Sequence, residues 1–159
     1  MKYFIIKLVF LITFVCNSKE VILKIEGSGR GKEYEVMQLQ DMGKVVLYKT
    51  EGNFKTDLDL YGSTDCLGVF KKINNAADLD LTCDFVDQNN NTMWANIIRK
   101  TEDIDAGIGR MFIIGGTGVW QHLRGTSCKY AVTINKSIWF TSTICKVKKE
   151  NFKKFKNNL

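Results

Sequence analysis

Hydrophobic and polar residues alternate with a period of two along much of the chain. Residues 78–85, DLDLTCDF, are the clearest case, because apolar side chains fall on one face and acidic or hydroxyl side chains on the other. Such alternation is typical of a half-buried β-strand. The sequence offers no long window with the 3.6-residue apolar period of a helix. We therefore predict an all-β fold.

Short extended segments recur between stretches rich in Gly, Asn and Asp. The stretch GSGRGK is predicted to be a turn between the first two segments, and a change of apolar phase inside the second indicates a β-bulge. Many short strands joined by such turns predict a single antiparallel β-barrel, because closure removes exposed strand edges; a β-sandwich is the alternative. The predicted strands are residues 20–25, 33–40, 44–51, 61–71, 78–86, 92–100, 109–114, 128–134 and 138–147.

Four of the cysteines form two pairs with the same spacing. Cys66 and Cys83 are 17 positions apart, and so are Cys128 and Cys145. If the chain folds back in the middle of each interval, the two cysteines become cross-strand neighbours about 4.5 Å apart, which suits a disulfide. A structural zinc site usually shows short pairs such as C-x₂-C, which are missing. We predict two hairpin disulfides, Cys66–Cys83 and Cys128–Cys145.

The first 18 residues have the layout of a secretory signal peptide. Lys2 and Lys7 precede an apolar run over residues 8–15, and the small residues Cys16 and Ser18 stand at −3 and −1 of a cut after position 18. A membrane anchor needs roughly 20 apolar residues, and this run is far shorter. Lipidation of Cys16 needs a small residue before it, and Val15 is not small. We predict a signal peptide at 1–18, a barrel domain at 19–147, no transmembrane segment in the mature chain, and a secreted or periplasmic location.

Positive charge is concentrated at the end of the chain. The formal net charge is +6, and the final stretch KVKKENFKKFKNNL carries six lysines against one glutamate. A basic tail with Phe152 and Phe155 could contact anionic lipid or nucleic acid. A frayed, solvated end at 148–159 is the simpler prediction. Since the rest of the domain is nearly neutral, we expect no nucleic-acid partner.

Two glycine-rich stretches, GSGRGKE and GGTG, invite comparison with phosphate-binding loops. A P-loop requires G-x-x-x-x-G-K-[ST], and here Lys32 is followed by Glu33. A dinucleotide fingerprint needs a helix directly after it, whereas predicted strands follow both stretches. We therefore interpret these glycines as turn residues and points of close backbone approach.

The second of these stretches belongs to a longer motif over residues 115–130. An apolar strand is followed by GGTGVW, a short polar segment and GTSCKY, an arrangement that resembles the signature of the allene oxide cyclase and dirigent barrels. The resemblance implies an eight-stranded β-barrel with an apolar interior, often a trimer, in a family whose plant members cyclise or couple unsaturated small molecules. It transfers no catalytic residue. The matching residues are Gly115, Gly116, Thr117, Gly118, Trp120, Gly125, Thr126 and Tyr130.

Few side chains offer catalytic or metal-binding chemistry. His122 is the single histidine, and the spacing supplies no partner to orient it as a base. Asp103 and Asp105 lack the ordered set of oxygen ligands that a calcium loop needs, so an Asx turn explains them better. We expect no cofactor and no metal. Asn90 and Asn135 begin NNT and NKS sequons, whose glycosylation the sequence leaves open.

Two charged residues, Arg99 and Glu51, each fall on the apolar face of a predicted strand. The free-energy cost of burying a charge without a partner is prohibitive, so a charge on such a face must be paired or hydrogen-bonded. If these faces line the barrel, Arg99 and Glu51 form the polar end of an apolar ligand pocket. The alternative is that both lie at strand ends with their charged groups in solvent. Tyr48 and Trp94 fall on the opposite faces of the same strands.

Three functions remain compatible with these residues. We favour an exported, disulfide-stabilised barrel that binds a small apolar ligand or a partner protein without chemical conversion. The alternative is a cyclase or isomerase, in which the shape of the pocket directs an unsaturated substrate and few titrating groups are needed. The third is a surface-acting protein that works through its basic tail, which deletion of 148–159 would reveal.

Overall fold

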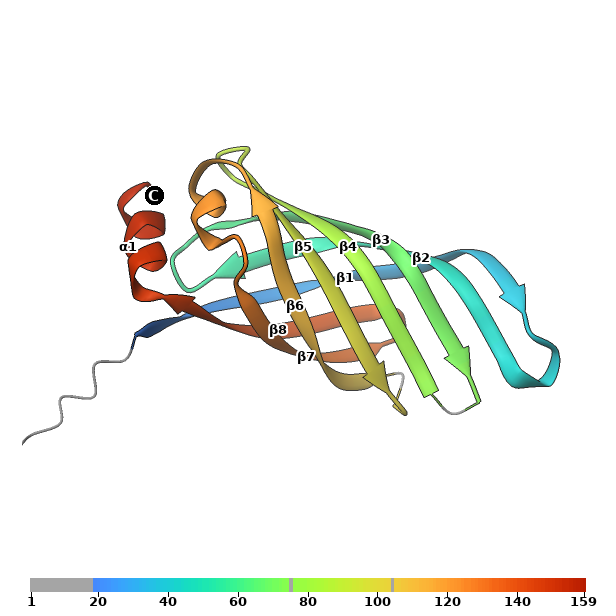
Figure 1. Cartoon of the computed structure of the whole chain (residues 1–159). Coiled ribbons are helices and arrows are strands. Elements are labelled where there is room, and N and C mark those ends of the chain that lie inside the picture. Colours follow the sequence, from blue (N-terminus) through green and yellow to red (C-terminus); the bar gives the residue numbers. More distant parts are fainter. Residues whose placement is uncertain (1–18, 75, 104) are drawn as a thin grey trace, which may run out of the picture.

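The computed structural model describes residues 19–74, 76–103 and 105–159. Its strands form one closed antiparallel barrel in the order β1-β2-β3-β4-β5-β6-β7-β8, with β8 paired to β1 (Figure 1). The predicted eight-stranded barrel is confirmed, and the predicted signal peptide lies outside the described residues. The strands are β1 Glu20–Gln38, β2 Gly43–Thr56, β3 Tyr61–Ile73, β4 Ala76–Asp87, β5 Thr92–Thr101, β6 Ala106–Gly116, β7 Ser127–Asn135 and β8 Ile138–Lys148.

Strand β1 runs without a break through GSGRGK, so the predicted turn between 20–25 and 33–40 is wrong. Gly27, Gly29 and Gly31 follow Ile25 at intervals of two, on the face of β1 that points into the barrel. Side-chain atoms of Trp139 would meet a Cβ at Gly27 or Gly29, and those of Tyr48 would meet one at Gly31. These glycines therefore make room for rings from the neighbouring strands.

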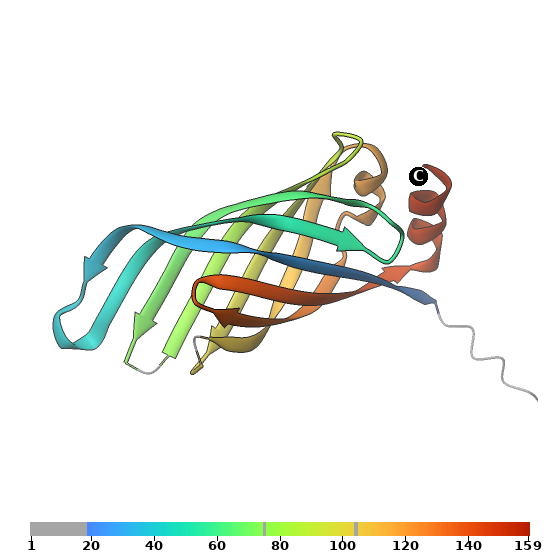
Figure 2. The same ribbon diagram turned by 180° about the vertical axis from the view of Figure 1, so that it is seen from behind.

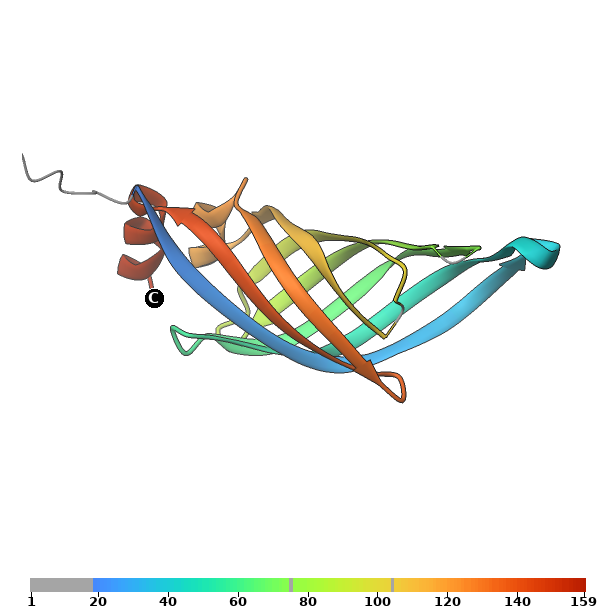
Figure 3. The ribbon, with the colours of Figure 1, turned by 90° about the horizontal axis from the view of Figure 1, so that it is seen from below.

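The far half of β1 forms an arm with β2. Their register shifts between Glu33 and Glu35, so the segment 33–40 contains an irregularity, but it precedes the change of apolar phase from which the β-bulge was predicted. Strand β8 pairs with β1 only as far as Arg30, so the rest of β1 pairs with β2 alone. This hairpin projects beyond the barrel and ends in a short 3-10 helix, η1 Gln40–Met42 (Figure 3).

Both predicted disulfides are present. Cys66 on β3 is bonded to Cys83 on β4, and Cys128 on β7 is bonded to Cys145 on β8, with Cα–Cα distances of 4.0 and 4.1 Å. All four cysteines are buried and lie directly opposite their partners in the strand register. Each disulfide thus joins neighbouring strands from inside the barrel, as the equal spacing predicted.

One end of the barrel is covered by two helices, η2 Gly118–Leu123 and α1 Lys149–Asn157, which lie side by side (Figure 2). Phe155 of α1 is fully buried, and its ring centroid is 5.3 Å from that of Trp120 in η2. The predicted frayed tail at 148–159 is therefore wrong, because Phe152 and Phe155 fall three positions apart on one face of a helix and pack together. No helix in the described part of the chain is long and apolar enough to cross a membrane.

Candidate functional site

The barrel encloses a cavity of about 210 Å³. Residues from all eight strands contribute to its walls, as expected for the inward positions of a closed barrel. Most of the wall is apolar, and hydroxyl-bearing threonines interrupt it. The apolar lining residues are Ile25, Phe54, Cys66, Phe70, Leu79, Leu81, Phe85, Ile97, Met111, Val132 and Ile134, and the threonines are Thr50, Thr64, Thr141 and Thr143.

The two ends of the cavity differ. Phe54 and Phe85 meet edge-to-face at one end, with centroids 5.4 Å apart, and Phe54 also packs on Trp120 beneath the helices. The other end carries the turns of the β3–β4, β5–β6 and β7–β8 hairpins. There the exposed residues Glu33 and Asp105 contribute to the lining, so the cavity reaches the surface at this end.

The two predicted site residues are not brought together. Arg99 lines the cavity and is only 4% exposed, so the alternative that its guanidinium lies in solvent is wrong. Its side chain lies over Gly107, where a Cβ would approach the Arg99 Cδ to 3.3 Å. Glu51 lies on the outer face of β2, with its side chain 65% exposed and 2.5 Å from the Lys49 Nζ. The inward face of β2 is the opposite one, which carries Tyr48.

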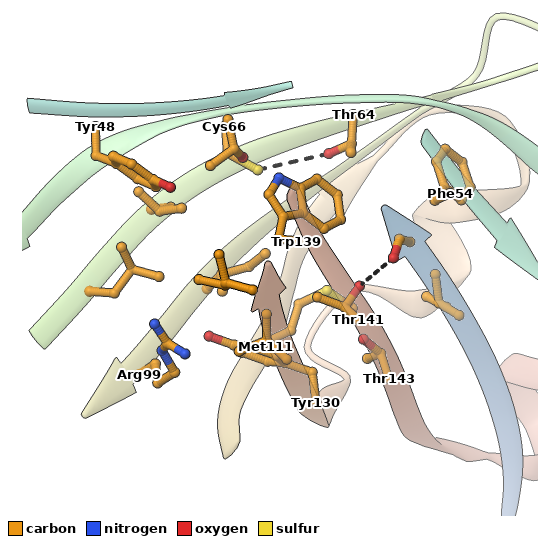
Figure 4. A pocket seen from close by; sticks show the side chains of 18 of the residues that line it. Tyr48, Phe54, Thr64, Cys66, Arg99, Met111, Tyr130, Trp139, Thr141 and Thr143 are labelled. Carbon is orange, nitrogen blue, oxygen red and sulfur yellow. Dashed lines mark hydrogen bonds between the residues drawn. The ribbon is translucent and has the colours of Figure 1, made fainter. Parts of the chain in front are cut away.

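Near Arg99 stands Tyr130, whose hydroxyl is buried without a hydrogen-bond partner among the described residues. Figure 4 shows this hydroxyl pointing toward Arg99. Burial raises the pKa of Tyr130 to about 12, although the positive charge of Arg99 acts to lower it. The phenol therefore stays protonated at neutral pH and can donate a hydrogen bond.

Two further aromatic residues bring polar atoms into the same space. Trp139 projects into the cavity (Figure 4), and its indole N–H is buried without an acceptor among the described residues. Burial and the charge of Glu33 raise the pKa of Tyr48, while Arg99 acts to lower it. Tyr48 also lines the cavity, whereas Trp94 on β5 is 41% exposed on the outside.

Sequence reasoning did not single out Tyr130 or Trp139 as cavity donors. The signal that would have found them is glycine at inward positions of a strand, because an aromatic ring from the neighbouring strand occupies the space beside each of these glycines. Tyr130 lies over Gly109, and Trp139 lies over Gly27 and Gly29.

The GGTG motif builds the covered end of the barrel and does not line the cavity. The Thr117 hydroxyl accepts a 2.8 Å hydrogen bond from the backbone N–H of Thr92, and the Trp120 indole donates to Asp87 Oδ2 at 2.9 Å. Gly118 adopts a φ of 52°, in the left-handed region, and an added Cβ there would overlap Asn91. The motif therefore positions Trp120 in the core by turn chemistry.

The other candidates for chemistry lie away from the cavity or form turns. His122 lies half-buried in η2 and is not among the lining residues. Asp103 Oδ1 accepts hydrogen bonds from the backbone of Asp105 and Ala106 at 2.9 and 3.3 Å, which is Asx-turn geometry. Within residues 19–74, 76–103 and 105–159, no group of three or more His, Cys, Asp or Glu side chains is placed to hold a metal. Asn90 and Asn135 are exposed, and their glycosylation stays a prediction.

Comparison with known proteins agrees with this architecture. No protein-family model matches the sequence, and no curated protein matches it. The structure is similar to that of the pterocarpan synthase dirigent protein GePTS1, with a TM-score of 0.52 and 13% sequence identity, over 94% of this chain and 100% of that chain. Similarity at this level of identity concerns the fold. The chain therefore has a dirigent-like eight-stranded β-barrel, as the GGTG motif predicted.

Proposed function

We propose that this protein is an exported, disulfide-stabilised barrel that binds a small apolar molecule in its cavity without converting it. The observation that carries the proposal is the cavity itself, which is enclosed by a closed barrel and lined mainly by apolar side chains. Pockets of this kind, with a few placed polar groups, are the usual form of small-molecule sites. The two disulfides fit an oxidising compartment, and the leader-like first 18 residues fit export.

The volume of the cavity limits the ligand. An apolar cavity of about 150 Å³ in another protein stays dry and binds benzene. The cavity here, at about 210 Å³, suits a molecule of one or two rings or a short branched chain. Its wall supports binding by burial of apolar surface, worth about 25 cal/mol per Å² removed from water.

A second candidate is a cyclase or isomerase acting on an unsaturated molecule. It is favoured by the name of the structural neighbour, a pterocarpan synthase dirigent protein, and by Tyr130 and Arg99 beside the cavity. In such a protein, pocket shape would hold a reactive substrate in a productive conformation. Release of a molecule with an altered structure would favour this second candidate.

The proposal is tested with a neutral fluorescent probe of two rings, 1-naphthylamine, titrated into the mature protein. Thr143 is buried and lines the cavity, whereas its neighbour Ile144 is 47% exposed on the outer face. We expect the wild type and the control Ile144→Phe to bind the probe and Thr143→Phe to lose most of the binding. Thr143→Met is a milder filling variant in case the larger side chain prevents folding. Equal binding by the wild type and a folded Thr143 variant would overturn the proposal.

A further inference from the structure

We propose that the cavity takes an apolar carboxylic acid, whose carboxylate accepts a hydrogen bond from the Tyr130 hydroxyl beside Arg99. This inference rests on the proposed function and adds the chemical class of the ligand. Two buried donors in the cavity, the Tyr130 hydroxyl and the Trp139 indole N–H, have no acceptor among the described residues.

Tyr130 and Trp139 each bring a buried donor into the cavity. The Tyr130 hydroxyl is buried, the residue is only 5% exposed, and no described residue bonds to that hydroxyl. The Trp139 indole N–H is buried in the same cavity, and an indole nitrogen can only donate. A buried donor left without an acceptor costs free energy. A ligand that brings acceptor oxygens would remove this cost.

The buried charge at the cavity is positive. Among the described residues, Arg99 and Asp87 are the buried charged side chains, and Asp87 lies at the covered end, bonded to Trp120. Arg99 has interactions within the chain, and its positive charge still acts on both Tyr48 and Tyr130. A planar guanidinium is well matched to a carboxylate.

The carboxylates that contribute to the lining do not cancel the preference for an anionic ligand. Glu33 lies at the open end, where Lys44 Nζ is 2.6 Å from its Oε1. Asp105 and Glu26 are exposed to solvent, where charges are screened. Arg99 is the buried charge of the cavity in the described residues.

The charged and the apolar lining residues lie toward opposite ends of the cavity. Arg99 lies two residues before the end of β5, on the side of the open end, whereas Phe54 and Phe85 form the apolar floor near the helices. A molecule with one acidic group and an apolar body therefore fits with its carboxylate toward the opening and its body toward the floor. The threonines between these ends leave space, because their side chains are small.

A matched ligand series tests the inference. Calorimetric titrations at neutral pH compare 2-naphthoic acid, 2-naphthalenemethanol and 2-naphthylmethylamine, which share one apolar body and differ in charge. We expect the acid to bind about tenfold more tightly than the alcohol, since hydrogen bonds to charged groups are the stronger ones, and the amine to bind most weakly. Arg99→Met should abolish the preference for the acid over the alcohol, and Tyr130→Phe should reduce it.

The controls separate the inference from the proposed function. Arg110→Met removes an exposed arginine from β6 and should leave the preference unchanged, and Arg99→Lys, which keeps the charge, should retain part of it even if Arg99→Met fails to fold. Equal binding of acid and alcohol by the wild type would overturn the inference and leave the proposed function standing. Failure of every member of the series to bind would overturn both proposals.

Discussion

Large aromatic rings inside the barrel lie where the neighbouring strand carries glycine. Trp139 covers Gly27 and Gly29, and Tyr130 covers Gly109. Glycine in a strand usually costs stability because of its backbone entropy. Here a ring from the next strand occupies the space that a side chain at the glycine would take.

The contact between Gly109 and Tyr130 can be measured directly. A Cβ on Gly109 would lie 2.5 Å from the Tyr130 ring, and its nearest neighbours are all atoms of that side chain. We therefore expect Gly109→Ala to destabilise the wild type by about 1–3 kcal/mol, as overpacking does. In a Tyr130→Ala background the same change should cost much less. Equal costs in chemical denaturation of the two backgrounds would show that the ring does not occupy this space.

The raised pKa of Tyr130 predicts a dependence of stability on alkaline pH. Its pKa is raised from the ordinary value of 10.0 to about 12. Between these values the unfolded chain ionises this phenol while the folded chain keeps it protonated, so the free energy of unfolding falls as the pH rises. Below pH 10 the contribution is fully present.

Removing the hydroxyl tests this assignment. In Tyr130→Phe we expect a shallower fall of the unfolding free energy between pH 10 and 12. The absorbance change of tyrosinate formation near pH 12 should also be smaller than in the wild type. Identical pH profiles for the two proteins would mean that Tyr130 is not the buried phenol described here.

At the scale of elements, the helix α1 converts the end of the chain into part of the core. Lys149–Asn157 places Phe155 against Trp120 and Phe152, while most of its lysines point to solvent. The GGTG motif supplies the other half of this contact, since its turns hold Trp120 in place. The helix and the motif together close the floor of the barrel.

This packing predicts a large effect of a single substitution in the tail. Phe155→Ala should destabilise the protein by about 3–5 kcal/mol, the usual cost of truncating a buried phenylalanine. Lys154→Ala, one residue earlier and exposed, should change stability by less than about 0.5 kcal/mol. Thermal unfolding of the two variants checks this. Equal stability of the two variants would support the prediction of a frayed, solvated end at 148–159.

The sequence was sufficient for the elements that depend on local alternation. Residues 78–85 show the pattern of one strand, and the equal spacing of Cys66–Cys83 and Cys128–Cys145 reports two hairpins. The sequence pattern did not predict structure correctly where a residue contacts side chains that are far away along the chain. The glycines of β1 read as a turn, because the rings that cover them belong to β2 and β8.

The same reason explains the outcome for the site. Alternation places Arg99 and Glu51 on a face of their own strands, but it does not say which face of each strand points inward. Closure of the barrel turns the Arg99 face of β5 inward and the Glu51 face of β2 outward. The tail was predicted poorly because its apolar signal, Phe152 and Phe155, is short and surrounded by lysine.

At the scale of the whole molecule, the barrel has a covered floor and an open end. The helices and the Phe54–Phe85 pair lie at the floor, and Arg99 and Tyr130 lie toward the opening. The arm formed by β1 and β2 extends beyond the barrel on the open side (Figure 1). Under the proposed function, one end stabilises the fold and the other admits the ligand.

The most direct test of the central claim is native mass spectrometry of the protein purified from its own cells or their medium, compared with the same sample denatured. We expect a small-molecule adduct in the native spectrum that disappears on denaturation and is absent from Thr143→Phe. If native wild-type protein, in whatever oligomeric state, carries only the mass of its chains even after incubation with 2-naphthoic acid and 2-naphthalenemethanol, the cavity is not a ligand site and the account is contradicted.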